Sequence, residues 1–213
     1  MHIITELFHV ERCQTKLKSD FSTSKHQWEQ VNNEFEESQI DNGYYWMKNK
    51  SPHNWHYFKV KSPVNNFENY VFDTSIELIS KNEHGHFGLV WGFDKNMEVL
   101  NRFCLSADGE RFLIMQFQKD HKKVFHRFHK RLSPKINVNQ PVRFTIIKMG
   151  DYFHFLINQK NMYICHESQF NNNDQFVGYY VEPGLHIKSN YFEIKKIIAK
   201  EMDVFTGLNL LIE

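Results

Sequence analysis

Two carboxylates, Asp73 and Glu77, are of a type and spacing to be considered for glycoside hydrolysis. Glycoside hydrolysis uses two carboxyl groups, about 5–9.5 Å apart, one as an acid and one as a nucleophile or base. Residues 69–79 alternate between apolar and polar side chains, which places both acids on one face of a strand. Because positions i and i+4 of a strand lie about 13 Å apart, at ~3.3 Å per residue, hydrolysis would need a further carboxylate from another strand.

Aromatic side chains form a second group, since their rings can stack on the CH faces of sugars. The candidates are Tyr45, Trp46, Trp55, Tyr57 and Trp91. A protein of this size also needs many buried aromatic residues, so packing is the alternative role for each. We expect Tyr45 and Trp55 to stack on a ligand. His86 and Arg102 are expected to donate hydrogen bonds to it, because they alternate with apolar residues on their strands and should point away from the core.

Metal-binding chemistry has two candidate locations. His84 and His86 would point to the same side of a strand, as two zinc ligands do, but no third ligand is evident and scattered surface histidines are the alternative. Residues 171–174, Asn-Asn-Asn-Asp, offer the oxygen atoms that Ca²⁺ prefers, with a solvated turn as the alternative. We therefore expect no cofactor, and Ca²⁺ at residues 171–174 is the alternative to that expectation.

Composition narrows the function classes. The 213 residues carry a formal charge of +1, so no overall field attracts nucleic acid, and no apolar stretch approaches the ~20 residues of a membrane helix. Three widely spaced cysteines, Cys13, Cys104 and Cys165, indicate no disulfide framework. These features predict a cytoplasmic protein, or a secreted one if a signal peptide has been removed. The one basic run, residues 121–135, is expected to be a charged edge strand, with an interface for phosphates, sulfated glycans or an acidic protein as the alternative.

The elements that must position these residues are strands. Residues 86–93 alternate large apolar side chains with small or polar ones, and Gly88 and Gly92 would let a ligand approach the backbone. Residues 101–118 form a hairpin around Asp108-Gly109. Similar segments recur every ~8–12 residues. The sequence predicts an all-β, antiparallel β-sandwich of about 12–14 strands in a single domain, residues 20–213, preceded by a lead-in segment at residues 1–19.

Several short motifs carry a family resemblance across about residues 20–198. They include Asp20-Phe21-Ser22 followed by Trp28, the Gly88-Leu89-Val90-Trp91-Gly92 strand and the late Tyr191-Phe192-Glu193-Ile194 strand. Their order resembles the concanavalin A-like lectin/glucanase superfamily, in particular its laminin-G-like bacterial domains. The resemblance implies a jelly-roll fold.

Members of this superfamily bind glycans, bind proteins or hydrolyse polysaccharides. The E-x-D-x-x-E or E-x-D-x-E string of its laminarinase-like hydrolases is missing from this sequence. We therefore expect a non-catalytic binding module that recognises a glycan or a protein surface through its concave sheet and rim loops. A divergent glycoside hydrolase using Asp73 and Glu77, and a structural domain of homo-oligomers, are the alternatives.

Overall fold

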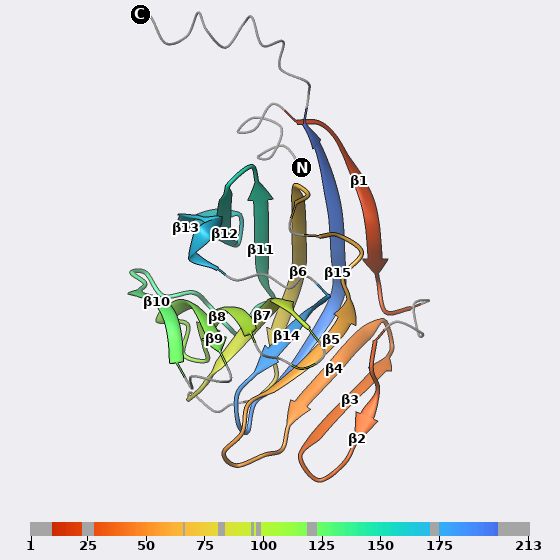
Figure 1. Ribbon diagram of the computed structural model, residues 1–213. Coiled ribbons are helices and arrows are strands. Elements are labelled where there is room, and N and C mark those ends of the chain that lie inside the picture. Colours follow the sequence, from red (N-terminus) through yellow and green to blue (C-terminus); the bar gives the residue numbers. More distant parts are fainter. Residues whose placement is uncertain are drawn as a thin grey trace, which may run out of the picture.

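The protein folds into two antiparallel β-sheets (Figure 1). The computed structural model describes residues 10–22, 28–65, 67–80, 84–94, 96, 99–118, 123–170 and 175–199, although not the side chains of 10–12, 123–127 and 199. In these ranges the only helix is the 3₁₀ turn η1 (Glu167–Gln169), so no described helix has the length to cross a membrane.

The larger sheet has nine strands. In spatial order it contains β13 (Lys160–His166), β12 (Tyr152–Ile157), β11 (Val142–Met149), β6 (Tyr70–Leu78), β15 (His186–Ala199), β4 (Tyr44–Asn49), β3 (Glu36–Asp41) and β2 (Val31–Asn32), with β1 (Val10–Ser19) also paired to β15.

The smaller sheet has six strands. Its order is β10 (Lys123–Arg131), β9 (Arg111–Gln118), β8 (Val99–Ser106), β7 (His86–Phe93), β14 (Phe176–Val181) and β5 (His56–Lys61). The antiparallel sandwich predicted from side-chain alternation is confirmed.

Three details differ from the prediction. The described residues contain 15 strands rather than 12–14. Part of the expected lead-in, Val10–Ser19, is strand β1 of the larger sheet, because its backbone pairs with the C-terminal half of β15. The late strand expected at Tyr191-Phe192-Glu193-Ile194 is part of the longer strand β15 (His186–Ala199), which has a register shift between Ser189 and Tyr191.

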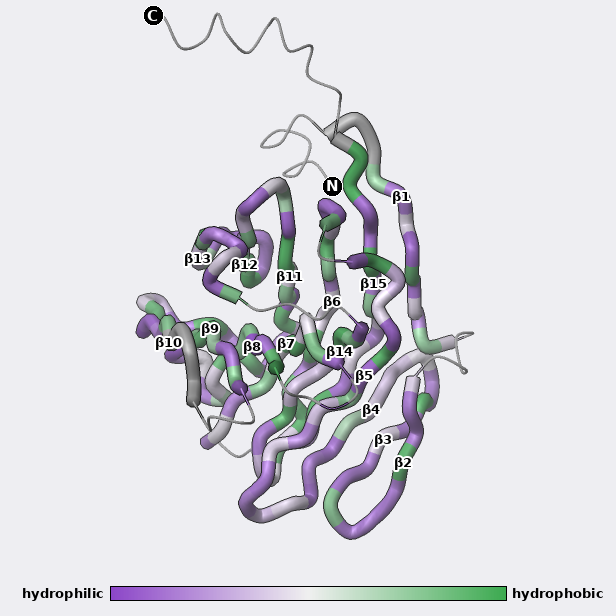
Figure 2. The backbone as a smooth tube through the Cα atoms, viewed as in Figure 1, coloured by the Kyte–Doolittle hydropathy of each residue, from purple (hydrophilic) through white to green (hydrophobic). Residues whose placement is uncertain are grey.

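The main core fills the space between the sheets and is rich in aromatic rings. Phe72 and Ile76 of β6 and Phe144 and Ile146 of β11 meet Phe87 and other residues of the smaller sheet there, and the apolar stretch of β11 is visible in Figure 2. The motif residues Phe21 and Trp28 lie in this core, each against Tyr45, with ring centres 5.5 and 5.2 Å away. The early motif is therefore a packing feature.

Candidate functional site

The outer face of the six-stranded sheet carries an apolar cluster of its own. Its buried members are Val90, Phe93, Leu100, Cys104, Leu113 and Tyr180, and five partly buried residues pack on them: Trp55, Tyr57, Met115, Phe117 and Phe176. These residues come from β5, β7, β8, β9 and β14 and from the end of the loop before β5. The partly buried rings of Trp55, Tyr57, Phe117 and Phe176 make this outer face aromatic.

Arg102 of β8 lies in the middle of this aromatic surface. The centre of its guanidinium is 4.1 Å from the centroid of the Trp55 ring, 4.6 Å from that of Tyr180 and 5.7 Å from that of Phe117. Stacking on several aromatic faces stabilises a guanidinium that is only 6% exposed. The alternation of β8 thus places Arg102 on the outer face of its sheet, as the sequence predicted.

A polar chain runs from Arg102 to His86. Arg102 Nη1 donates to Tyr180 Oη at 3.0 Å, and Tyr180 Oη donates to Glu182 Oε1 at 3.0 Å. The other carboxylate oxygen of Glu182 lies 3.1 Å from His86 Nδ1. Burial pushes the pKa of Glu182 up, but the hydrogen bonds from His86 and Tyr180 outweigh it and the pKa lies below its ordinary value.

An open pocket of about 620 Å³ lies beside Trp55. Its lining combines aromatic rings, hydrogen-bond donors and carboxylates: Glu29, Glu36, Asn54, Trp55, His56, Tyr57, Lys59 and Phe117. His56 Nδ1 is 3.0 Å from Glu36 Oε2, while His56 Nε2 is buried without a hydrogen-bond partner. Aromatic walls with a few oriented polar groups are what small-molecule and sugar sites require.

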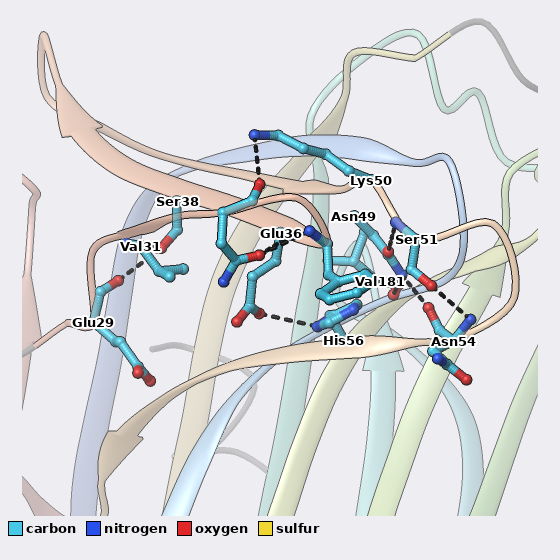
Figure 3. A network of polar contacts seen from close by, with 12 residues as sticks. Glu29, Val31, Glu36, Ser38, Asn49, Lys50, Ser51, Asn54, His56 and Val181 are labelled. Carbon is cyan, nitrogen blue, oxygen red and sulfur yellow. Dashed lines mark hydrogen bonds and ion pairs between the residues drawn. The ribbon is translucent and has the colours of Figure 1, made fainter.

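The loop between β4 and β5, residues 50–55, is held by a polar network that Figure 3 shows. The fully buried Asn49 donates from Nδ2 to the carbonyl of Asn54 at 2.8 Å and to that of Val181 at 2.9 Å. Its Oδ1 accepts from the backbone N–H of Ser51, and Ser51 Oγ accepts from that of Asn54. Because Trp55 directly follows Asn54, this network fixes the backbone position from which the Trp55 side chain extends.

Three of the four predicted ligand-binding residues lie on this one surface. Trp55 lines the pocket, Arg102 stacks on Trp55, and His86 joins Arg102 through Tyr180 and Glu182.

The expectation for Tyr45 is wrong. Its side chain is fully buried between the sheets, and its Oη donates to the carbonyl of Glu29. On β4 the aromatic residues that face outward are Tyr44 and Trp46, on the outer face of the other sheet.

Sequence reasoning missed Tyr180 and Glu182. The stretch Phe176-Val177-Gly178-Tyr179-Tyr180-Val181 is apolar throughout, so alternation gives no sign of which face Tyr180 occupies. A signal did exist in Glu182, an acid two residues beyond Tyr180 and hence on the same side of the chain.

Asp73 and Glu77, the acid pair of the hydrolase alternative, both contact other side chains of the protein. Asp73 accepts two hydrogen bonds from Arg143 at 2.8 Å each and one from Thr145 at 2.8 Å. Glu77 forms an ion pair with Lys188 at 3.2 Å. Both acids belong to β6 of the nine-stranded sheet, and neither is among the residues that line the pocket.

The remaining sequence candidates are the metal sites and the basic run. Within the ranges that the structure describes, no three His, Cys, Asp or Glu side chains gather as a metal site would need. The calcium candidate, residues 171–174, lies outside the described residues. Part of the basic run forms the edge strand β10, where the sequence placed it; residues 121–122 and the side chains of 123–127 are outside the description.

Known proteins resemble this chain in fold. No protein-family profile and no curated protein matches its sequence. Among solved structures, carbohydrate-binding module CBM66 from Bacillus subtilis is similar, with 17% identity, a TM-score of 0.56, and 80% of this chain and 97% of that one covered.

Two further structures cover most of this chain. An endo-β-1,3-glucanase from Pyrococcus furiosus has 8% identity and a TM-score of 0.61, covering 88% of this chain and 96% of that one. The CBM2 module of the evolved Dit of Lactobacillus casei BL23 phage J-1 has 11% identity and a TM-score of 0.57, covering 90% of this chain and 99% of that one. At these identities the likeness concerns the fold, and this chain is a concanavalin A-like jelly roll, as its sequence resemblance predicts.

Proposed function

We propose that this protein binds a glycan on the outer face of its six-stranded sheet, in the pocket beside Trp55. The observation that carries the proposal is the pocket itself, where the rings of Trp55, Tyr57 and Phe117 stand beside the polar side chains of Asn54 and Lys59. Sugar rings present apolar CH faces together with hydroxyl groups, so they need this mixture of surfaces. Carbohydrate-binding modules among the similar structures support the same reading.

The binding is proposed to be non-catalytic. A glucanase is also among the similar structures, and the contacts of the carboxylates are what support the non-catalytic proposal. Glu36 is held by His56 at 3.0 Å, and Asp73 and Glu77 are engaged on the other sheet. Glu29 is left as an exposed pocket acid, and a hydrolase needs two carboxyl groups with different protonation states.

A glycan array with purified protein tests this proposal. We expect selective binding that Trp55→Ala abolishes and that Trp46→Ala, a matched change on the opposite sheet, leaves intact. Circular dichroism checks that both variants are folded. Silence across the array, or loss of binding in Trp46→Ala alone, would contradict the proposed site.

The non-catalytic part has its own assay. The bound glycan is incubated with protein and the release of reducing ends is measured, with Glu29→Gln and Glu36→Gln alongside. We expect no release by any form. Release that disappears in either variant would assign hydrolysis to the pocket. A protein ligand and homo-oligomers stay predictions, and size-exclusion chromatography with light scattering tests the second.

A further inference from the structure

One edge of the Arg102 guanidinium is unused. Nη1 donates to Tyr180 Oη at 3.0 Å and lies 3.9 Å from the sulfur of Met115. Nε is buried and has no hydrogen-bond partner, and Nη2 makes no hydrogen bond to any residue that the structure describes. The Nε and Nη2 donors form the side of a guanidinium that grips a carboxylate through two parallel hydrogen bonds.

Arg102 also has no direct counter-ion among the residues that the structure describes. No carboxylate of the described chain lies within ion-pair distance of its guanidinium, and Glu182 reaches it only through the hydroxyl of Tyr180. Buried cations are ordinarily paired, and at 6% exposure Arg102 is an exception. An unpaired buried cation with an unfilled two-donor edge is suited to an anion that arrives with a ligand.

Arg102 contacts the wall of the proposed glycan site, although it is not itself among the residues that line the pocket. Trp55 and Phe117, whose rings contact the guanidinium, both line the pocket. Nη2 is not among the fully buried atoms, so it is the part of the edge that a ligand meets first.

The charges of the pocket fit an anionic ligand. Lys59 adds a second cation to the lining: its Nζ lies 5.1 Å from the ring centroid of Phe176 and 5.7 Å from that of Tyr57, with no carboxylate partner in the described residues. Of the pocket acids, Glu36 is held by His56 and Glu29 is exposed, where water and salt screen its charge.

We propose that Arg102 makes this site selective for glycans that contain a carboxylated sugar. This inference rests on the proposed function: the sugar ring stacks on Trp55, and its carboxylate accepts hydrogen bonds from Nε and Nη2 of Arg102. Lys59 adds a longer-range attraction. Neutral sugars leave the two-donor edge unfilled and bind more weakly.

Matched glycan pairs test the inference. Calorimetric titrations compare oligogalacturonate, oligoalginate and hyaluronan fragments with the same glycans after reduction of each carboxyl group to an alcohol. We expect at least one acidic glycan to bind tenfold or more tightly than its reduced partner, since hydrogen bonds to charged groups are roughly twice as strong as neutral ones. In Arg102→Lys, which keeps the charge but loses the planar edge, this ratio should fall below threefold.

The outcomes separate the two claims. Equal binding of the acidic and reduced forms, both lost in Trp55→Ala, would overturn the inference and leave the glycan site standing. Preference for sulfated over carboxylated glycans, or an unchanged ratio in Arg102→Lys, would also overturn it. No binding of either series would contradict the proposed function itself. The wild-type comparison needs no variant, so it stands even if Arg102→Lys fails to fold.

Discussion

The guanidinium of Arg102 stacks on the indole of Trp55, 4.1 Å from the ring centroid. A residue in the middle of strand β8 thereby supports a residue at the end of the β4–β5 loop, and the two come from positions 47 residues apart in the sequence. This contact joins the rigid sheet to the wall of the pocket. A site built on strands holds its ligand groups more steadily than one on loops alone.

Asn49→Ala should destabilise the protein at the loop that carries Trp55. The change removes the donor for two backbone carbonyls, those of Asn54 and Val181, in a fully buried position. We expect the free energy of unfolding to fall by about 2–3 kcal/mol, because buried polar groups lose their partners. Urea denaturation measures it, and Asn139→Ala, at an exposed position, is the control that should change it little. Equal stability of the two variants would show that the loop does not depend on Asn49.

Asp73→Asn separates stability from binding. The substitution breaks the paired hydrogen bonds with Arg143 at 2.8 Å, so we expect a loss of roughly 3 kcal/mol in unfolding free energy. Glycan affinity, measured at a temperature where the variant is fully folded, should stay within twofold of the parent. A folded Asp73→Asn variant that no longer binds glycan would show that Asp73 belongs to the functional site.

Gly88→Ala tests the shape of the six-stranded sheet. A Cβ at this position would come within 2.1 Å of the carbonyl oxygen of Phe103 on β8, so the neighbouring strand would have to shift. We expect a loss of roughly 3 kcal/mol or more, as for an overpacked core. The expectation that Gly88 exposes the backbone to a ligand is therefore replaced by a packing role.

Gly43→Ala is the matched control for that prediction. The position has open space around it and a φ of +76°, so backbone strain of about 1 kcal/mol is the whole expected effect. Thermal unfolding of both variants decides the matter. A Gly88→Ala protein as stable as Gly43→Ala would mean that the strands adjust without loss.

His186 should make stability depend on pH. Burial, and to a lesser degree Lys48, lowers the pKa of His186, so between its folded pKa and its unfolded pKa of ~6.5 the unfolded chain binds the extra proton. Its contribution is complete above ~6.5 and is lost as the pH falls through the folded value, at no more than about 1.4 kcal/mol per pH unit. Urea titrations at pH 7 and pH 5 should show a smaller loss in His186→Gln than in the parent. The exposed His53→Gln should behave like the parent, and the same loss in all three proteins would refute the effect.

The fold was largely predictable because alternation is strong where one face is buried. Residues 69–79 place Tyr70, Phe72 and Ile76 in the core, as their period of two indicates. For the same reason His86 and Arg102 point away from the main core, as expected, while their contact with a ligand stays a prediction. Tyr45 failed because Tyr44-Tyr45-Trp46 is aromatic at every position, so the sequence gives no means of telling the inward residue from the outward ones.

The site as a whole could not be assembled from sequence. In the pocket Glu29, which lies before β2, and Glu36, the first residue of β3, come close to β5 and to the end of β9. These neighbours follow from the order of the strands in space. Asn49 looks like any loop asparagine until its two carbonyl partners, one of them 132 residues away, are known. Long-range contacts of this kind leave no local pattern.

The proposed glycan site is tested most directly by calorimetry. The best ligand from a glycan array is titrated into the parent protein, into Trp55→Ala and into Trp46→Ala. We predict that Trp55→Ala lowers affinity by at least tenfold, since the loss of one buried ring removes about 1.5–3 kcal/mol, while Trp46→Ala binds within twofold of the parent. Full affinity in a folded Trp55→Ala protein would contradict the central claim that the pocket beside Trp55 is the glycan site.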